Sequence, residues 1–207
     1  MKGKFIAFEG CEGSGKSTQL KLLAEYLIGH GVDFILTREP GGSEISEQIR
    51  GIILNGKNTD MCDECEALLY AAARVQHLKQ TVMPALEDGK LVICDRYIYS
   101  SLAYQGYARG LGVEFVESVN AYALEHCPAD MTVFLDISPV DAFERKHGAD
   151  ENDRMEQQGL EFHKRVYAGY KALQAKHPDI CAVDCLGTKE QTAEKIINLL
   201  KERRVID

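Results

Sequence analysis

The fold is decided by the stretch Gly10-Cys11-Glu12-Gly13-Ser14-Gly15-Lys16-Ser17, which fits the phosphate-binding pattern G-x-x-x-x-G-K-[ST] at every fixed position. The glycines let the backbone turn so that successive N–H groups point inward at phosphate oxygens. The helix that follows adds the positive end of its dipole. The stretch therefore predicts a nucleotide-phosphate site in which Lys16 reaches the β- and γ-phosphates and Ser17 ligates Mg²⁺.

The residues on either side of the loop supply the structural context that it needs. Phe5–Glu9 reads as a strand, and Lys16–Gly29 reads as a helix with an apolar stripe through Leu20, Leu23 and Leu27. The same alternation continues, and it predicts an α/β fold of the P-loop NTPase type, a doubly wound parallel five-stranded sheet flanked by helices. Further strands are expected at 33–39, Leu91–Asp95, 131–137 and 181–185, and helices at Glu44–Leu54, 61–86, 113–126, from Pro139, 153–176 and 189–203.

Local signals refine two of these helices. Pro84 falls inside the helical pattern at 61–86, so that helix should kink or end there. Thr188-x-x-Gln191 is a capping box, and it predicts that the last helix begins directly after Thr188.

Composition limits the partners. The 207 residues are 45% hydrophobic and 27% charged, as is typical of one globular domain, which is expected to cover residues 1–207. A net charge of −8 argues against nucleic-acid binding, which needs a basic surface. The apolar runs are far shorter than the roughly 20 residues of a membrane span, so no membrane association and a cytoplasmic location are expected.

The seven cysteines are predicted to be reduced thiols, because they are odd in number and no secretory signal is present. The alternative is a four-ligand zinc site built from Cys62-x-x-Cys65 and Cys181-x-x-x-Cys185. Cys11, inside the phosphate loop, is expected to make the protein sensitive to thiol reagents.

A carboxylate and an arginine stand together where the strand Leu91–Asp95 ends. Asp95 is placed to hold Mg²⁺ directly or through water, and Arg96 is placed to grip a transferring phosphoryl group. No Asp-x-x-Gly follows this strand and no Asn-Lys-x-Asp is present, so a switch GTPase is not favoured. A small-molecule kinase is the preferred interpretation, and a nucleotide-gated binding module is the alternative from another class.

Three further segments carry a family resemblance. They are 37–42 (Thr-Arg-Glu-Pro-Gly-Gly), 68–77 (Leu-Leu-Tyr-Ala-Ala-Ala-Arg-Val-Gln-His) and 95–106 (Asp-Arg-Tyr-Ile-Tyr-Ser-Ser-Leu-Ala-Tyr-Gln-Gly). Together with the phosphate loop, they make the chain resemble the bacterial thymidylate kinases, in order and over nearly its whole length. The resemblance implies ATP-dependent phosphorylation of dTMP to dTDP, with Mg²⁺, in a homodimeric cytoplasmic enzyme. A kinase for another nucleoside monophosphate or a deoxynucleoside is the alternative within enzymes.

The resemblance also implies roles for single residues at the base end of the acceptor site. Tyr70 stands where the family usually has the Phe that stacks on thymine, and Arg74 matches the arginine that hydrogen-bonds the base. Tyr104 matches the aromatic residue that lies against the deoxyribose. Ser101 and Gln105 fall where polar groups read the pyrimidine edge.

At the phosphate end, Arg38 and Arg96 match the arginines on the acceptor phosphate, and Glu12 matches the carboxylate that reaches the sugar 3′-hydroxyl. Glu9 resembles the family's acidic residue near the metal. The implied metal ligands are thus Ser17, Asp95 and Glu9. The implied ATP-binding set is Gly10, Cys11, Glu12, Gly13, Ser14, Gly15, Lys16, Ser17 and Thr18.

Residues 143–156 are mixed in charge and are expected to form a lid that closes over ATP and excludes water. In the resemblance, forms without an arginine in the phosphate loop carry their catalytic cations in the lid, and this loop has Gly13 at that place. Arg145, Lys146 and Arg154 are therefore the candidates, with Arg154→Ala expected to reduce turnover far more than dTMP affinity. The implied catalytic set is Lys16, Arg96, Arg145 and Arg154.

Overall fold

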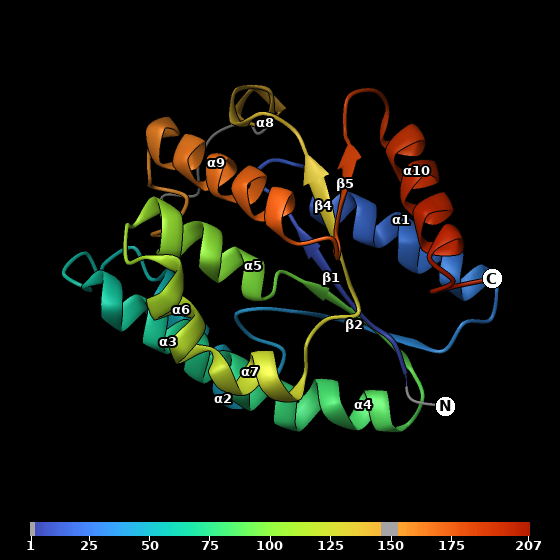
Figure 1. Ribbon diagram of the computed structural model, residues 1–207, viewed down its shortest axis with the longest axis horizontal. Coiled ribbons are helices and arrows are strands. Elements are labelled where there is room, and N and C mark those ends of the chain that lie inside the picture. The colour runs from blue at the N-terminus through green and yellow to red at the C-terminus, as the bar shows by residue number, and fades with distance from the viewer. Residues whose placement is uncertain (1–2, 146–152) are drawn as a thin grey trace.

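The computed structural model describes residues 3–145 and 153–207. Its centre is a sheet in which all neighbouring strands run parallel, in the order β2-β3-β1-β4-β5 (Figure 1). Parallel neighbours cannot be joined by tight turns, so helices fill the connections. The strands are β1 (Phe5–Glu9), β2 (Phe34–Arg38), β3 (Leu91–Asp95), β4 (Met131–Asp136) and β5 (Ile180–Asp184).

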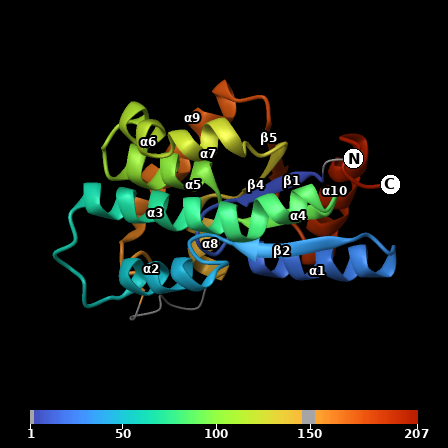
Figure 2. The same cartoon turned by 90° about the horizontal axis from the view of Figure 1, so that it is seen from below.

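Helices cover both faces of the sheet (Figures 1 and 2). The described helices are α1 (Lys16–Gly29), α2 (Glu44–Leu54), α3 (Asp63–His77), α4 (Met83–Glu87), α5 (Ile98–Ser101), α6 (Val113–Val119), α7 (Ala121–His126), α8 (Pro139–Arg145), α9 (Leu160–Lys176) and α10 (Lys189–Glu202). Two π-helical segments, η1 (Leu78–Val82) and η2 (Leu102–Ala108), continue α3 and α5.

Alternating side chains of β1 divide the apolar core into two layers. Ile6 and Phe8 pack in a cluster with apolar residues of α1 and α10, whereas Phe5 and Ala7 pack in a cluster with residues of η2 and α9. β1 is the middle strand and is buried on both faces, which explains why it is apolar up to its last residue.

The carboxyl ends of β1, β2 and β3 meet along one edge of the sheet. Phe8 of β1 and Arg38 of β2 are both in register with Asp95 of β3. The loops that leave these three ends therefore start side by side, as ligand sites in open parallel sheets require.

The predicted fold class is confirmed, and the five predicted strands match the observed ones to within one residue at each end. The helices Lys16–Gly29 and Glu44–Leu54 are confirmed, as is the capping box of α10, in which Thr188 and Gln191 bond reciprocally. These elements are specified by residues close in sequence, which a pattern can detect.

Three longer helix predictions were wrong in part. The helix predicted at 61–86 runs without a break from Asp63 to Glu87 as α3, η1 and α4, but its hydrogen-bond pattern becomes π-helical at Leu78–Val82, directly before the turn that holds Pro84. The helix at 113–126 breaks at Asn120. Residues 153–159 form turns and α9 begins at Leu160, because the Asp153 carboxylate accepts from the backbone N–H groups of Met155 and Glu156.

Residues 98–108, for which no helix was predicted, are helical as α5 and η2. No helix within residues 3–145 and 153–207 combines the length and the apolar character needed to cross a membrane.

Candidate active site

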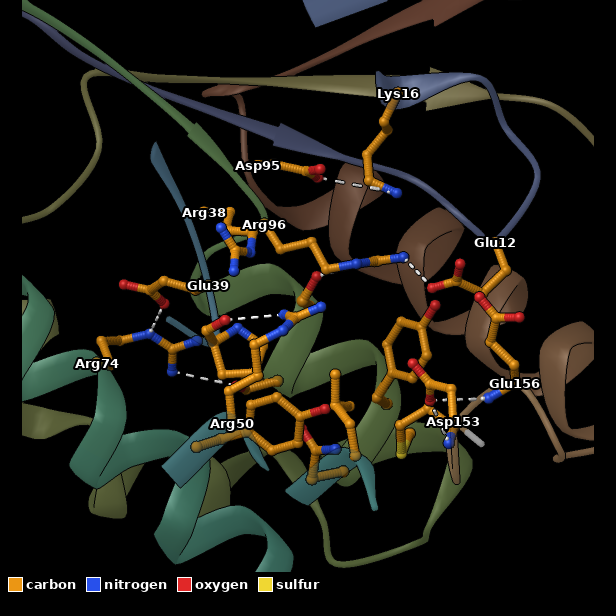
Figure 3. Close-up of a pocket in the computed structure, with 18 of the residues that line it drawn as sticks. Glu12, Lys16, Arg38, Glu39, Arg50, Arg74, Asp95, Arg96, Asp153 and Glu156 are labelled. Carbon is orange, nitrogen blue, oxygen red and sulfur yellow. Dashed lines mark hydrogen bonds and ion pairs between the residues drawn. The ribbon is translucent and has the colours of Figure 1, made fainter. Parts of the chain in front are cut away.

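The carboxyl edge of the sheet opens onto a cavity of about 190 Å³ (Figure 3). The phosphate loop lies at one end, and α3 and η2 lie at the other. Most residues that the sequence assigns to the two nucleotides, and the metal candidate Asp95, line this one cavity. They are Glu12, Lys16, Ser17, Arg38, Tyr70, Arg74, Asp95, Arg96, Ser101, Tyr104 and Gln105.

The phosphate loop depends on backbone conformations that favour glycine. Gly13 has a φ of 76°, and Gly15, the N-cap of α1, has a φ of 88°. A side chain at either position would strain the backbone. The Ser14 hydroxyl is buried and has no hydrogen-bond partner among the described residues, so a polar atom is left for a ligand inside the loop. Thr18, in the first turn of α1, is exposed and does not line the cavity.

Lys16 is buried at the start of α1. Its Nζ lies 3.4 Å from the carbonyl oxygen of Gly10 and 4.0 Å from Asp95 Oδ1. Burial, followed by repulsion from Arg96, lowers the pKa of Lys16, whereas the Asp95 carboxylate opposes this shift. A polyphosphate at this position would supply the negative charge that the buried ammonium group lacks.

The residues at the loop mouth fit a magnesium ion. Asp95 Oδ1 is buried and has no hydrogen-bond donor among the described residues, and the Ser17 hydroxyl borders the same cavity. A carboxylate oxygen and a hydroxyl are hard oxygen ligands of the kind that Mg²⁺ takes together with phosphates and water. Asp95 and Ser17 are thus compatible with the metal site that the sequence predicts.

Arg96 connects the phosphate loop to the acceptor end. Its backbone φ is 70°, an uncommon value for a residue with a side chain. Its guanidinium group donates to Glu12 Oε1 at 2.5 Å and to the Gly10 carbonyl at 2.9 Å, and it lies over the ring of Tyr104. The strained backbone and these contacts hold a cation midway along the cavity.

Arg74 is held in place by hydrogen bonds from all three of its guanidinium nitrogens. Its Nε donates to Glu39 Oε2 at 2.6 Å, its Nη1 donates to Ser101 and to Asn120 Oδ1, and its Nη2 donates to the Tyr97 carbonyl. A guanidinium group has five N–H donors, so one Nη2 hydrogen has no partner among the described residues and remains for a ligand. The side chain is 2% exposed, which rules out a solvated surface charge.

Two tyrosines form the apolar walls of the acceptor end. Tyr70 comes from α3, and burial, followed by the nearby Glu66 carboxylate, raises the pKa of its phenol, so the ring is neutral. Tyr104, from η2, packs edge-on against Phe162 and Tyr170. Its hydroxyl is buried and has no hydrogen-bond partner in the described part of the chain.

Arg38 and Arg50 also line the cavity (Figure 3). Arg38, at the end of β2, donates to Glu47 at 2.9 Å and is half-exposed. Arg50, on α2, donates to the Pro40 carbonyl at 2.8 Å and was missed by the sequence analysis, since nothing in the helical pattern separates it from a surface charge. The other lining residues, to which the sequence analysis gave no individual role, are Glu39, Pro40, Leu54, Ser100, Asp153, Met155 and Glu156.

Comparison with known proteins agrees with this geometry. The family model for thymidylate kinase matches residues 8–196. This chain belongs to the thymidylate kinase family. The thymidylate kinase of Finegoldia magna is 46% identical over 202 residues, covering 98% of this chain and 100% of the relative. Those of Oceanobacillus iheyensis and Clostridium novyi are 47% and 49% identical, covering 98% and 86% of this chain and 93% and 88% of each relative.

In this member of the thymidylate kinase family, Glu9 does not lie where the sequence analysis expected a metal ligand. The side chain is 0% exposed and does not line the cavity. One carboxylate oxygen accepts from the backbone N–H groups of Tyr97 and Ser100, and the other accepts from the hydroxyls of Ser100 and Tyr170. Burial raises the pKa of Glu9. With all these donors in place, Glu9 anchors the start of α5, and its role as a metal ligand stays a prediction.

Arg154 also lies away from the expected position. It is 6% exposed, donates from Nε to the Ile53 carbonyl at 3.0 Å and pairs through Nη2 with the buried carboxylate of Glu66. It does not line the cavity, although Asp153, Met155 and Glu156 beside it do. In this structure Arg154 ties the turns at 153–159 to α2 and α3 through these two contacts. It does not lie at the phosphate loop.

Arg145, the other predicted lid cation among the described residues, does not lie at the phosphate loop either. Arg145, at the end of α8, donates to the Cys185 carbonyl at 3.1 Å and does not line the cavity. Lys146 and the middle of the predicted lid lie outside the described residues, so closure over ATP stays a prediction.

The cysteines do not form the alternative zinc site. Cys62 and Cys65 stand at the start of α3, whereas Cys181 is in β5 and Cys185 follows it, and these elements lie on opposite sides of the molecule in both views (Figures 1 and 2). Cys11 is 1% exposed, and burial raises the pKa of its thiol to about 12. The expected sensitivity at Cys11 is therefore not supported, because the thiolate is the reactive form.

Proposed function

We propose that this protein transfers the terminal phosphoryl group of ATP to dTMP, giving ADP and dTDP. One observation supports this most strongly. The phosphate loop with Lys16 and the pocket of Tyr70 and Arg74 are two ends of one cavity, with Arg96 between them. The cavity therefore has a place for a polyphosphate donor and for a nucleotide acceptor that meets it end to end.

The donor end is proposed to bind ATP through backbone N–H groups of residues 10–15 and the buried ammonium group of Lys16. Ser17 and Asp95 would hold Mg²⁺, which supplies charge neutralisation at the β- and γ-phosphates when bound. These residues position the terminal phosphate beside Arg96. No covalent enzyme intermediate is required, because transfer depends on alignment and on electrostatic stabilisation.

The acceptor end is proposed to hold dTMP with its base toward α3 and its phosphate toward Arg38 and Arg96. Tyr70 would stack on the base and Arg74 would donate to it. Tyr104 would lie against the deoxyribose. Glu12, which pairs with Arg96, would contact the sugar 3′-hydroxyl, as the family resemblance implies.

The reaction itself needs cations between two anions. A phosphate oxygen of dTMP attacks the γ-phosphorus of ATP, and the bond from that phosphorus to the β,γ-bridging oxygen breaks, so that ADP leaves. Lys16 and Arg96, which both line the cavity, would stabilise the negative charge that gathers during this step. Arg145 and Arg154 take no part in this proposal, because both are held elsewhere by protein acceptors.

The proposed enzyme acts as a homodimer in the cytoplasm, as the family resemblance implies. Leu68 on α3 and Leu124 on α7, two neighbouring helices, are exposed apolar side chains. Sedimentation of the purified chain tests the dimer, and a monomer at all concentrations would contradict it.

Measured ADP release tests the function, using ATP and Mg²⁺ with dTMP, dUMP, dCMP or dGMP as acceptor. The expected result is acceptor-dependent ADP formation that is fastest with dTMP and is lost in Lys16→Ala. ADP formation without an acceptor would instead support a slow hydrolytic binding module. A preference for dGMP would show a kinase for another nucleotide.

A further inference from the structure

Glu66, on α3, is a fully buried carboxylate with donors on both oxygens. Oε1 accepts from Gln105 Nε2 at 2.8 Å and from Arg109 Nε at 3.3 Å. Oε2 accepts from Arg109 Nη2 at 3.0 Å and from Arg154 Nη2. The side chain is 0% exposed, so these protein groups take the place of water.

These contacts decide which way the amide of Gln105 points. Guanidinium groups only donate, so the Glu66 oxygens that they contact are acceptors. The part of the Gln105 amide that faces Glu66 must therefore be its NH₂ group. The amide oxygen is left on the other side, where Gln105 lines the acceptor cavity, and no described residue donates to it.

We propose that Glu66 is a positioning residue that fixes Gln105 with its oxygen toward the acceptor, so that the pocket selects a base with a ring N–H group over one with an unprotonated ring nitrogen. The inference rests on the proposed function, since it concerns the base of the nucleotide that this pocket takes. It adds a specificity role for a residue that itself contacts no substrate.

Arg74 supplies a second group that selects the base. Its guanidinium group can only donate, and one of its hydrogens remains for a ligand at the same end of the cavity. A fixed donor and a fixed acceptor suit a carbonyl next to a ring N–H, as in thymine and uracil. Cytosine offers an amino group next to a bare nitrogen, and it would leave both protein groups unpaired.

Without Glu66, Gln105 could serve either kind of base. A free amide turns over by rotation about its last side-chain bond and can present its NH₂ group to a bare ring nitrogen. Glu66→Gln tests this, because glutamine has nearly the same shape and can either donate to Gln105 or accept from it.

The measurement is kcat/KM for dTMP, dCMP and dUMP in wild type and Glu66→Gln. The ratio of dTMP to dCMP should fall by about tenfold or more, as expected for a mispaired buried polar group. The ratio of dTMP to dUMP should change less than twofold, since both bases carry the ring N–H. A purely structural role would lower all three values together and leave both ratios unchanged.

Asp63→Asn is the matched control. Asp63 contacts the same Arg109 side chain at 3.3 Å from one turn earlier on α3 and is 42% exposed, but it does not touch Gln105. Both ratios should stay at their wild-type values in this variant.

Gln105→Met removes the amide and leaves the pairing of Glu66 with the two arginines. It should reduce the dTMP to dCMP ratio as much as Glu66→Gln, and the double variant should lose no more than either single one. If Glu66→Gln does not fold, an unchanged dTMP to dCMP ratio in Gln105→Met still overturns the proposal, because the proposal has Glu66 select the base by orienting Gln105.

An unchanged dTMP to dCMP ratio in folded Glu66→Gln, or in Gln105→Met, would overturn the proposal while wild type still prefers dTMP. If wild type itself does not prefer dTMP to dCMP, the proposed function fails at the base site. The two failures are therefore distinguishable.

Discussion

The two ends of the cavity are built by different means. The phosphate loop is a run of consecutive residues, and it shapes its site with backbone turns at Gly13 and Gly15. The acceptor end is made of side chains from α3 and η2, and its Arg74 and Gln105 side chains are held by partners far away in sequence. Glu39 and Arg74, for example, are 35 residues apart.

This difference predicts where substitutions matter. A backbone site tolerates changes at its variable side chains, because the N–H groups remain in place. A site made of side chains fails when a residue that positions one of them is removed, because a buried charge then loses its partner. Substitutions of the positioning residues at the acceptor end should therefore reduce stability and activity more than substitutions at the variable positions of the phosphate loop.

Glu39→Gln should have the largest effect. The Glu39 carboxylate accepts from Arg74 Nε at 2.6 Å and from His77 Nδ1 at 3.0 Å, and all three side chains are buried. Its loss should lower the free energy of unfolding by about 4 kcal/mol. It should also increase the KM for dTMP by a larger factor than the KM for ATP. Thermal unfolding and steady-state kinetics with each substrate varied in turn measure both effects.

Glu161→Gln is the control for that change, since Glu161 pairs with Lys164 on the exposed face of α9. Its unfolding midpoint should match wild type. Glu39→Gln with wild-type stability and an unchanged KM for dTMP would show that the acceptor end does not depend on its buried holders.

Arg154→Ala should have a smaller effect of the same kind. It removes one of the two arginines from Glu66, and Arg109 still contacts that carboxylate. Stability should fall by about 2 kcal/mol, and the KM for dTMP should rise because residues beside Arg154 line the cavity. An unchanged unfolding midpoint with a large loss of kcat would instead favour the catalytic role that the sequence suggested for Arg154.

The smallest effect is expected at Cys11 of the phosphate loop, where a thiol reagent should leave activity almost unchanged. With a pKa raised to about 12 by burial, only about one thiol in 10⁴ is ionised at pH 8, and the ionised fraction rises as the pH approaches 12. Iodoacetamide at pH 8 should modify the exposed Cys62 and Cys65 first and leave activity within twofold of the untreated protein. Peptide mapping that finds Cys11 alkylated as fast as Cys62 would contradict this.

The same difference explains what could be predicted from the sequence. The phosphate loop, the strands and the capping box of α10 depend on neighbours within a few residues, and all were predicted. The Glu66–Arg154 pair joins residues 88 apart, and nothing at either position indicates the other. An arginine in a charged segment is typical of a mobile surface, so Arg154 was assigned to the lid.

Glu9 illustrates a second limit of the sequence. An acidic residue at the end of a central strand is typical of a metal site, and Asp95 at the end of β3 fits one. Glu9 ends the neighbouring strand, but the backbone of α5 turns back onto its carboxylate. Which of two neighbouring carboxylates faces the cavity depends on the path of the following loop, and residues 98–108 had not been predicted to be helical.

The most direct measurement uses one compound that carries both nucleosides, a thymidine and an adenosine joined 5′ to 5′ by a chain of phosphates. In titration calorimetry and competition experiments it should bind one per chain, more tightly than dTMP or ATP alone, and displace both nucleotides together. Continued binding of either dTMP or ATP when the compound is saturating would contradict a single cavity in which the two substrates meet.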